Sequence, residues 1–134
     1  MSISPHLTYA GDCQQAIDLY VSAFNADVQT MSTYSEMRMA MPPGMEERVA
    51  HAVLDFDGGS VHLSDTLSHD PVRTGARIAL VYSGTLTQIQ QALDVLLEEG
   101  SRLPTVNAGV GAGVPNYTVH DRFGVTWQLV EAEY

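Results

Sequence analysis

The sequence carries one pattern twice, and this repeat constrains the fold more than any other feature. The first copy is Leu7–Asp12 followed by Gln14–Tyr20, and the second is Leu80–Thr85 followed by Gln90–Leu96. The strand-like parts lie 73 residues apart (82 minus 9) and the helix-like parts 76 residues apart (90 minus 14). In each copy a short alternating run passes through a glycine turn into the apolar stripe of an amphipathic helix. A repeat of about half the chain predicts a duplicated module rather than a solenoid.

Turn signals and β-branched runs extend both copies into the same order of elements. In the first half we expect a helix that Asp12 caps and that ends near Phe24, with strands over residues 4–10, 28–35, 49–56 and 60–65. In the second half we expect a helix over 86–99, with strands over 77–82, 101–108, 116–121 and 125–130. The order is βαβββ twice. It predicts an α+β fold in which the curved mixed sheets of two modules form a cleft.

The length of the chain favours one domain. At 134 residues, of which 45% are hydrophobic, it can bury a core without a disulfide or a metal. We expect a single domain over residues 1–134, with one module over about 1–65, a linker over about 66–74 and a second module over about 75–134.

The charge balance excludes several classes of function. The formal charge of −10 results from 16 acidic residues against 6 basic ones, so we expect neither nucleic acid nor an anionic membrane as a partner. All 6 basic residues are arginines, and the lack of lysine excludes a lysine Schiff base and a P-loop lysine. No apolar run has the length of a signal peptide or a membrane span, and a lone Cys13 cannot form an internal disulfide. Both features favour the cytoplasm.

Cys13 allows two interpretations. It follows Asp12 at the start of the first expected helix, where the helix dipole could lower its pKa and activate the thiol. A free cysteine is more often a small buried hydrophobic residue. We therefore expect an inert, packed thiol.

Several stretches are similar to one protein family, in the right order along nearly the whole chain. They are residues 5–12 with 16–24, then 49–54, 63–65 and 121–127. Together with the paired βαβββ order, they resemble the vicinal oxygen chelate superfamily of glyoxalases, extradiol dioxygenases and bleomycin-resistance proteins. Within it they resemble the PhnB-like branch, often labelled a 3-demethylubiquinone methyltransferase domain. The resemblance implies the fold and a homodimer, but not an activity, because this superfamily contains enzymes and pure binding proteins. The chain shows no S-adenosylmethionine-type or dinucleotide-type glycine pattern.

The resemblance also implies where a metal would bind. Glyoxalase-type sites take one ligand from each of four strands, and the matching positions here are Pro5 or His6, Asp55, Arg77 and Gln128. An arginine side chain stays protonated and only donates hydrogen bonds, so Arg77 cannot be a ligand, and its charge opposes a cation beside it. We therefore expect no metal and no other cofactor. A divalent metal bound by the nearby histidines and Asp55 is the alternative.

Strand alternation suggests a different use of the same region. His51 and Asp55 share one face of their strand, and Thr126 and Gln128 share one face of the last strand. We expect His51, Asp55, Arg77 and Gln128 to converge in an otherwise apolar cleft, as is typical of a small-molecule site. The candidate ligand-binding residues share this cleft or its mouth: Arg77, Gln128, Thr126, His6 and Ser64. His62, His69 and His120 lack metal-ligand spacing and are expected to be surface or strand residues.

Our hypothesis is that Arg77 anchors an anionic or carbonyl-bearing ligand while His51 or Asp55 transfers a proton. The alternative is that Arg77 and Asp55 only neutralise one another. Three functions remain open on these residues. The favoured one is a metal-free protein that binds or sequesters a small molecule. The others are a metal-dependent lyase or dioxygenase built on His6, His51 and Asp55, and a metal-free enzyme with His51 and Asp55 as acid and base.

Overall fold

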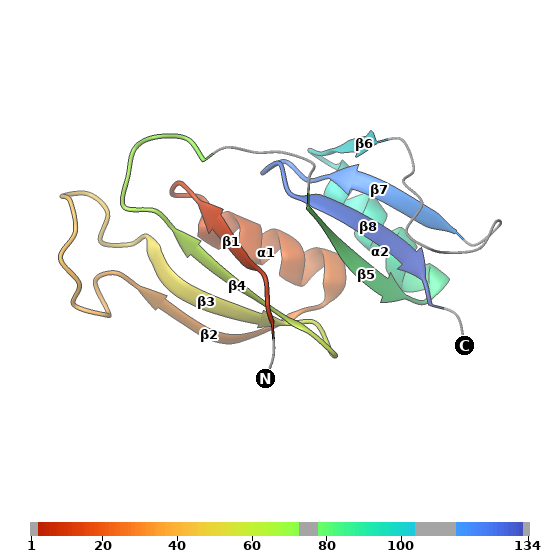
Figure 1. The fold of residues 1–134 in the computed structure, drawn as a ribbon, viewed down its shortest axis with the longest axis horizontal. Coiled ribbons are helices and arrows are strands. Elements are labelled where there is room, and N and C mark those ends of the chain that lie inside the picture. Colours follow the sequence, from red (N-terminus) through yellow and green to blue (C-terminus); the bar gives the residue numbers. More distant parts are fainter. Residues whose placement is uncertain (1–2, 73–77, 104–114, 133–134) are drawn as a thin grey trace. The chain divides into compact units, whose positions relative to one another are not determined.

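The computed structural model describes residues 3–72, 78–103 and 115–132, and the chain divides into two compact units, residues 1–72 and 73–134. Each unit packs one helix on a four-stranded sheet (Figure 1). The first unit contains β1 (His6–Tyr9), α1 (Cys13–Phe24), β2 (Asp27–Thr33), β3 (Val49–Asp55) and β4 (Ser60–Asp65). The second unit contains β5 (Ala79–Gly84), α2 (Leu86–Leu97), β6 (Ser101–Leu103), β7 (Asn116–His120) and β8 (Thr126–Glu131).

The two sheets have the same topology. Their strand orders are β1-β4-β3-β2 and β5-β8-β7-β6. In each unit the first and last strands pair in parallel, and the other neighbours pair antiparallel. The expected α+β fold of two βαβββ modules with mixed sheets is therefore confirmed. Residue 77 and most of the strand expected over 101–108 lie outside the described residues.

Each helix buries its apolar stripe on one face of its sheet. Ala16, Ile17 and Tyr20 of α1 are at most 1% exposed, and in β4 every second residue is buried. Ile89, Ala92 and Leu96 of α2 are equally buried and follow the spacing of one helix face. The opposite faces of the sheets are not covered by these helices.

The two helices start in different ways. Thr85 and Gln88 form a capping box at α2, in which each side chain accepts a hydrogen bond from the other residue's backbone N–H. The expected side-chain cap at α1 is wrong, because Asp12 makes no such bond. The carboxylate of Asp65 takes its place: its Oδ1 accepts hydrogen bonds from the backbone N–H groups of Gly11 (2.7 Å) and Cys13 (3.0 Å). The capping residue lies at the end of β4, far from α1 in the chain, so a local sequence pattern does not predict it.

Both helices are short. Within the described residues, none is long and apolar enough to cross a membrane. The expected end of α1 near Phe24 is confirmed, and Asn25 takes the left-handed conformation (φ 53°) that commonly follows a helix.

Candidate functional site

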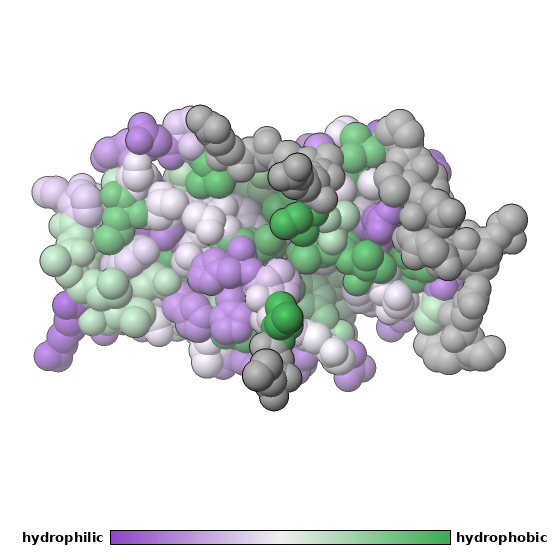
Figure 2. Space-filling view, in the orientation of Figure 1, coloured by the Kyte–Doolittle hydropathy of each residue, from purple (hydrophilic) through white to green (hydrophobic). Residues whose placement is uncertain are grey.

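Three imidazole rings lie together on the face of the first sheet opposite α1, and we call His6, His51 and His62 the histidine cluster. Their ring centroids are 5.1 Å apart for His51–His62, 6.2 Å for His6–His62 and 6.4 Å for His6–His51. Strand register explains the cluster. His6 pairs with His62 across β1 and β4, and Val53 pairs with His62 across β3 and β4, which makes His51 a diagonal neighbour. Hydrophilic side chains gather over this part of the sheet (Figure 2).

Hydrogen bonds hold the rings of the histidine cluster in place. Nε2 of His51 lies 2.9 Å from Nδ1 of His62, and Nε2 of His6 lies 2.8 Å from Oγ of Ser64. The pKa of His6 is lowered from its usual value, first by partial burial and then by repulsion from His51 and His62. A lowered pKa favours the neutral imidazole ring, which can accept as well as donate a hydrogen bond.

The Asp55 side chain stabilises the hairpin that follows β3. Its Oδ1 accepts the backbone N–H of Asp57 (3.1 Å), and its Oδ2 accepts a hydrogen bond from Nε2 of Gln29 (3.0 Å). His51 lies four residues away, which is roughly 13 Å along an extended strand. The structure therefore brings His51 to His62 rather than to Asp55.

In the second unit, Thr126 and Gln128 lie on the face of β8 opposite α2, with exposed fractions of 4% and 8%. Across the antiparallel pair, His120 of β7 is opposite Thr126, and Thr118 is opposite Gln128. We call these residues the β7–β8 polar row. Oγ1 of Thr126 and Nε2 of His120 are buried without a hydrogen-bond partner, which is uncommon for polar atoms.

The remaining sequence expectations concern residues in different units. Arg77 lies outside the described residues, His51 and Asp55 belong to the first unit, and Gln128 belongs to the second. The convergence of these side chains in one cleft therefore remains a prediction.

Two residues of these clusters were not expected from the sequence, His62 and His120. Each was expected to be an ordinary surface or strand histidine, because neither shows metal-ligand spacing. Alternation within β4 already places His62 on the same face as Ser64, and that signal could have found it. His120 required the register of β7 on β8, which places it beside Thr126.

Two positions of the metal centre that the resemblance implies are described in the first unit, His6 and Asp55. Within residues 3–72, 78–103 and 115–132, no three histidine, cysteine, aspartate or glutamate side chains are arranged to hold a metal ion. At the implied positions, the carboxylate of Asp55 is hydrogen-bonded within its hairpin, and His6 is hydrogen-bonded to Ser64. We derive no chemistry through a metal.

Cys13 is not part of a site. Its side chain is fully buried, and burial raises the pKa of the thiol, with a further rise caused by the carboxylates of Asp65 and Asp12. A raised pKa disfavours the thiolate, which is the reactive form. The expectation of a packed thiol is confirmed, and its lack of reactivity stays a prediction.

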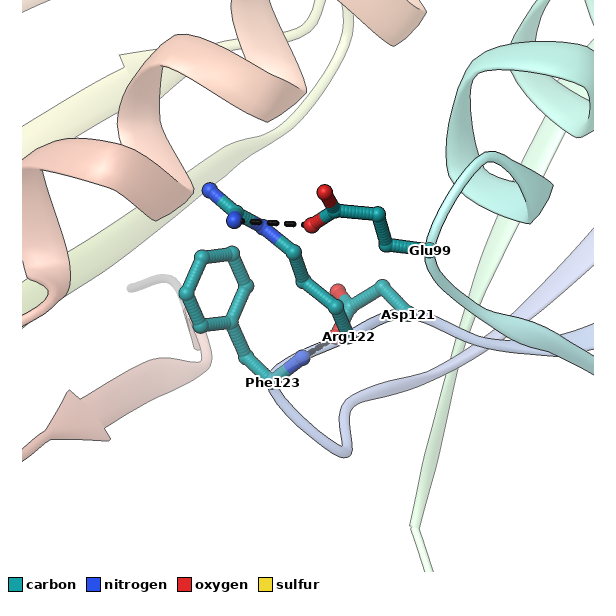
Figure 3. Close-up of polar contacts among 4 residues, drawn as sticks. All are labelled: Glu99, Asp121, Arg122 and Phe123. Atoms are coloured by element: carbon teal, nitrogen blue, oxygen red, sulfur yellow. Dashed lines mark hydrogen bonds and ion pairs between the residues drawn. The ribbon is translucent and has the colours of Figure 1, made fainter.

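The hairpin between β7 and β8 is organised by Asp121, which is 3% exposed. Its Oδ1 accepts hydrogen bonds from the backbone N–H groups of Phe123 (2.9 Å) and Val125 (3.1 Å). Figure 3 shows the outer part of this hairpin, where the Arg122 guanidinium meets the Glu99 carboxylate (2.9 Å) and lies near the Phe123 ring. The Asp121–Trp127 stretch, part of the family resemblance, is thus a structural motif.

A family model described as 3-demethylubiquinone-9 3-methyltransferase matches residues 1–130. The chain belongs to this family. This family is the PhnB-like branch of the vicinal oxygen chelate superfamily that the sequence resembles. Among curated proteins, none matches this PhnB-like chain.

Solved structures share the fold over the whole chain. A Bacillus cereus PhnB protein, itself assigned as a 3-demethylubiquinone-9 3-methyltransferase, is 24% identical, with a TM-score of 0.77 over 98% of this chain and 100% of its own. Protein PA1353 from Pseudomonas aeruginosa is 20% identical, with a TM-score of 0.81 over 100% and 99%. The fosfomycin resistance protein FosX from Listeria monocytogenes is 8% identical, with a TM-score of 0.66 over 100% and 93%.

Proposed function

We propose that this PhnB-like chain binds a small molecule on the sheet faces that its helices leave free, without the metal tetrad implied by the superfamily. The histidine cluster carries this proposal. Three imidazoles and Ser64 gather on one sheet face, held by the His51–His62 and His6–Ser64 hydrogen bonds. Such a group of placed donors and acceptors is typical of a binding site. One structure of the FosX relative is a complex with manganese(II) and a dihydroxypropylphosphonic acid, which supports small-molecule binding by this fold.

Ligand screening tests the proposal. We expect compounds that raise the melting temperature of the purified protein to bind at least about tenfold more weakly to His51→Ala and His62→Ala, because each variant removes a polar group of the site, a loss of about 1.4 kcal/mol. Arg77→Ala tests the predicted anchor in the same way. His69→Ala, which removes an exposed histidine of the same unit, is the matched control and should bind normally. Equal binding by all variants would contradict the proposal.

Elemental analysis tests the metal-free part of the proposal. The untagged protein is measured before and after loading with zinc, nickel and iron(II), followed by dialysis. About one retained ion per chain would contradict the metal-free proposal and favour the metal-dependent lyase or dioxygenase instead. The homodimer and the cytoplasmic location remain predictions.

The His51–His62 hydrogen bond favours a second candidate, a metal-free acid–base enzyme. A neutral imidazole carries one N–H, so whichever ring donates in this bond, the two outer nitrogens present one donor and one acceptor. A substrate group bound there could lose a proton to one ring and gain one from the other. In this candidate His62 takes the role that the sequence had suggested for Asp55.

The tautomers of the His51 and His62 rings can be measured, and they test whether the two rings are hydrogen-bonded. A hydrogen bond between Nε2 of His51 and Nδ1 of His62 requires both neutral rings to be the same tautomer, either both protonated at Nε2 or both at Nδ1. We expect long-range nitrogen–proton NMR spectra at pH 8 to show two matching tautomers, with His69 as an exposed reference. Two different tautomers would contradict the hydrogen bond and remove the acid–base candidate.

A further inference from the structure

Among the described residues, two adjacent side chains of the second unit bury a polar atom without a hydrogen-bond partner. Oγ1 of Thr126 and Nε2 of His120 are both buried, and their residues occupy directly opposite positions of β8 and β7. The Cβ atoms of such a pair are roughly 5 Å apart, so a single bound group can reach both side chains. Burying a polar atom without a partner costs free energy, and two adjacent instances indicate a missing partner rather than a packing accident.

The surroundings restrict what that partner can be. Beside Thr126, the paired residue of β5 is Ala79, whose side chain has no polar group. The described residues of this sheet face include no aspartate, glutamate or arginine; they are Ala79, Val81, Ser83, Ser101, Leu103, Asn116, Thr118, His120, Thr126, Gln128 and Val130. A buried carboxylate or phosphonate would have no arginine or lysine among them to balance its charge, and an unpaired buried anion is strongly disfavoured.

The hydrogen-bonding capacity of the pair points to one class of group. The Thr126 hydroxyl can donate and accept, and one imidazole nitrogen of His120 can donate or accept according to the tautomer. A hydroxyl or a carboxamide supplies both a donor and an acceptor and carries no charge. A carboxylate only accepts.

We propose that Thr126 and His120 form a subsite for an uncharged hydroxyl or carboxamide group of the ligand. This inference rests on the proposed function and names the chemistry of part of the ligand. It differs from the anion anchor expected at Arg77, which would bind another part of the same molecule.

The test uses the full chain labelled with ¹⁵N and four small probes. Acetamide and 2-propanol are the uncharged probes, and acetate and inorganic phosphate are the anionic ones. We expect acetamide to shift the amide signals of Thr126 and His120 saturably, with a dissociation constant on the order of 10 mM for so small a molecule. Thr126→Val, which keeps the side-chain shape and removes the hydroxyl, should weaken this binding at least tenfold. Thr8→Val on β1 is the matched control.

Stability without any probe gives a second readout. Because the Thr126 hydroxyl has no partner, Thr126→Val should keep or raise the urea midpoint of the free protein. A lowered midpoint, a saturable shift caused by the anions instead of acetamide, or a tightly held water that no probe displaces would each overturn the inference. If the probes fail at Thr126 while screened compounds still depend on His51 and His62, this inference alone fails. If binding of the screened compounds does not depend on His51 and His62 either, both this inference and the proposed function fail.

Discussion

Replacing Asp65 by alanine should destabilise the first unit by about 3–5 kcal/mol, the largest effect we expect from a single substitution outside the apolar core. The side chain is 2% exposed and accepts three backbone hydrogen bonds, from the N–H groups of Gly11, Cys13 and Val49 at 2.7, 3.0 and 2.9 Å. Alanine would leave these three donors without their partner. A loss of this size is a large fraction of the stability of a typical domain.

Amide hydrogen exchange is the appropriate measurement because it resolves the two units separately. We expect faster exchange throughout α1 and β3 in Asp65→Ala, with an intermediate effect in Asp65→Asn, whose single side-chain oxygen accepts fewer bonds. Asp12→Ala is the matched control. Asp12 stands at the N-cap position but makes no cap bond, so its removal should change stability by less than about 0.5 kcal/mol. Equal effects of the two alanine variants would contradict the assignment of the cap to Asp65.

Asp121→Ala should destabilise the second unit by about 3–4 kcal/mol. Besides the two backbone bonds in the hairpin, Oδ2 of Asp121 accepts the indole Nε1–H of Trp127 at 3.1 Å. Trp127 is 3% exposed, and alanine would leave its indole N–H buried without this acceptor. The effect combines a loosened turn with an unsatisfied group in the core.

Tryptophan fluorescence measures this effect directly, since the chain contains a single tryptophan. The urea midpoint of Asp121→Ala should fall well below that of the wild type. Arg122→Ala is the control from the adjacent position. Its ion pair with Glu99 is exposed, with side-chain exposed fractions of 35% and 65%, and such pairs contribute at most about 1 kcal/mol. A larger loss in Arg122→Ala than in Asp121→Ala would show that the hairpin depends on its surface contacts.

The element order could be predicted from sequence because periodicity and turn chemistry are local properties of the chain. The repeated strand–helix pattern located β1 with α1 and β5 with α2. The turn signal between the strands expected over 49–56 and 60–65 predicted the β3–β4 hairpin, and Asp57 and Gly58 take positive φ there (61° and 125°). Alternation also placed His51, Thr126 and Gln128 on the sheet faces opposite the helices.

The contacts of the candidate site required the tertiary structure. The distance between His51 and Asp55 follows from the extended strand alone. That His51 meets His62 depends on strand register, which the β3–β4 hairpin sets. The same holds for Asp65, which looked like a polar residue at a strand end and proved to be the cap of α1.

By itself, the sequence determined the two βαβββ modules, the positions of the helices and the side of each strand on which the polar residues lie. These features follow from the conformational preferences of neighbouring residues. The tertiary structure decided which polar side chains meet: His51 bonds to His62, Asp65 bonds to the start of α1, and Thr126 lies opposite His120. The reason is that side-chain hydrogen bonds reach only about 3 Å, so they depend on the register and packing of separate strands and helices.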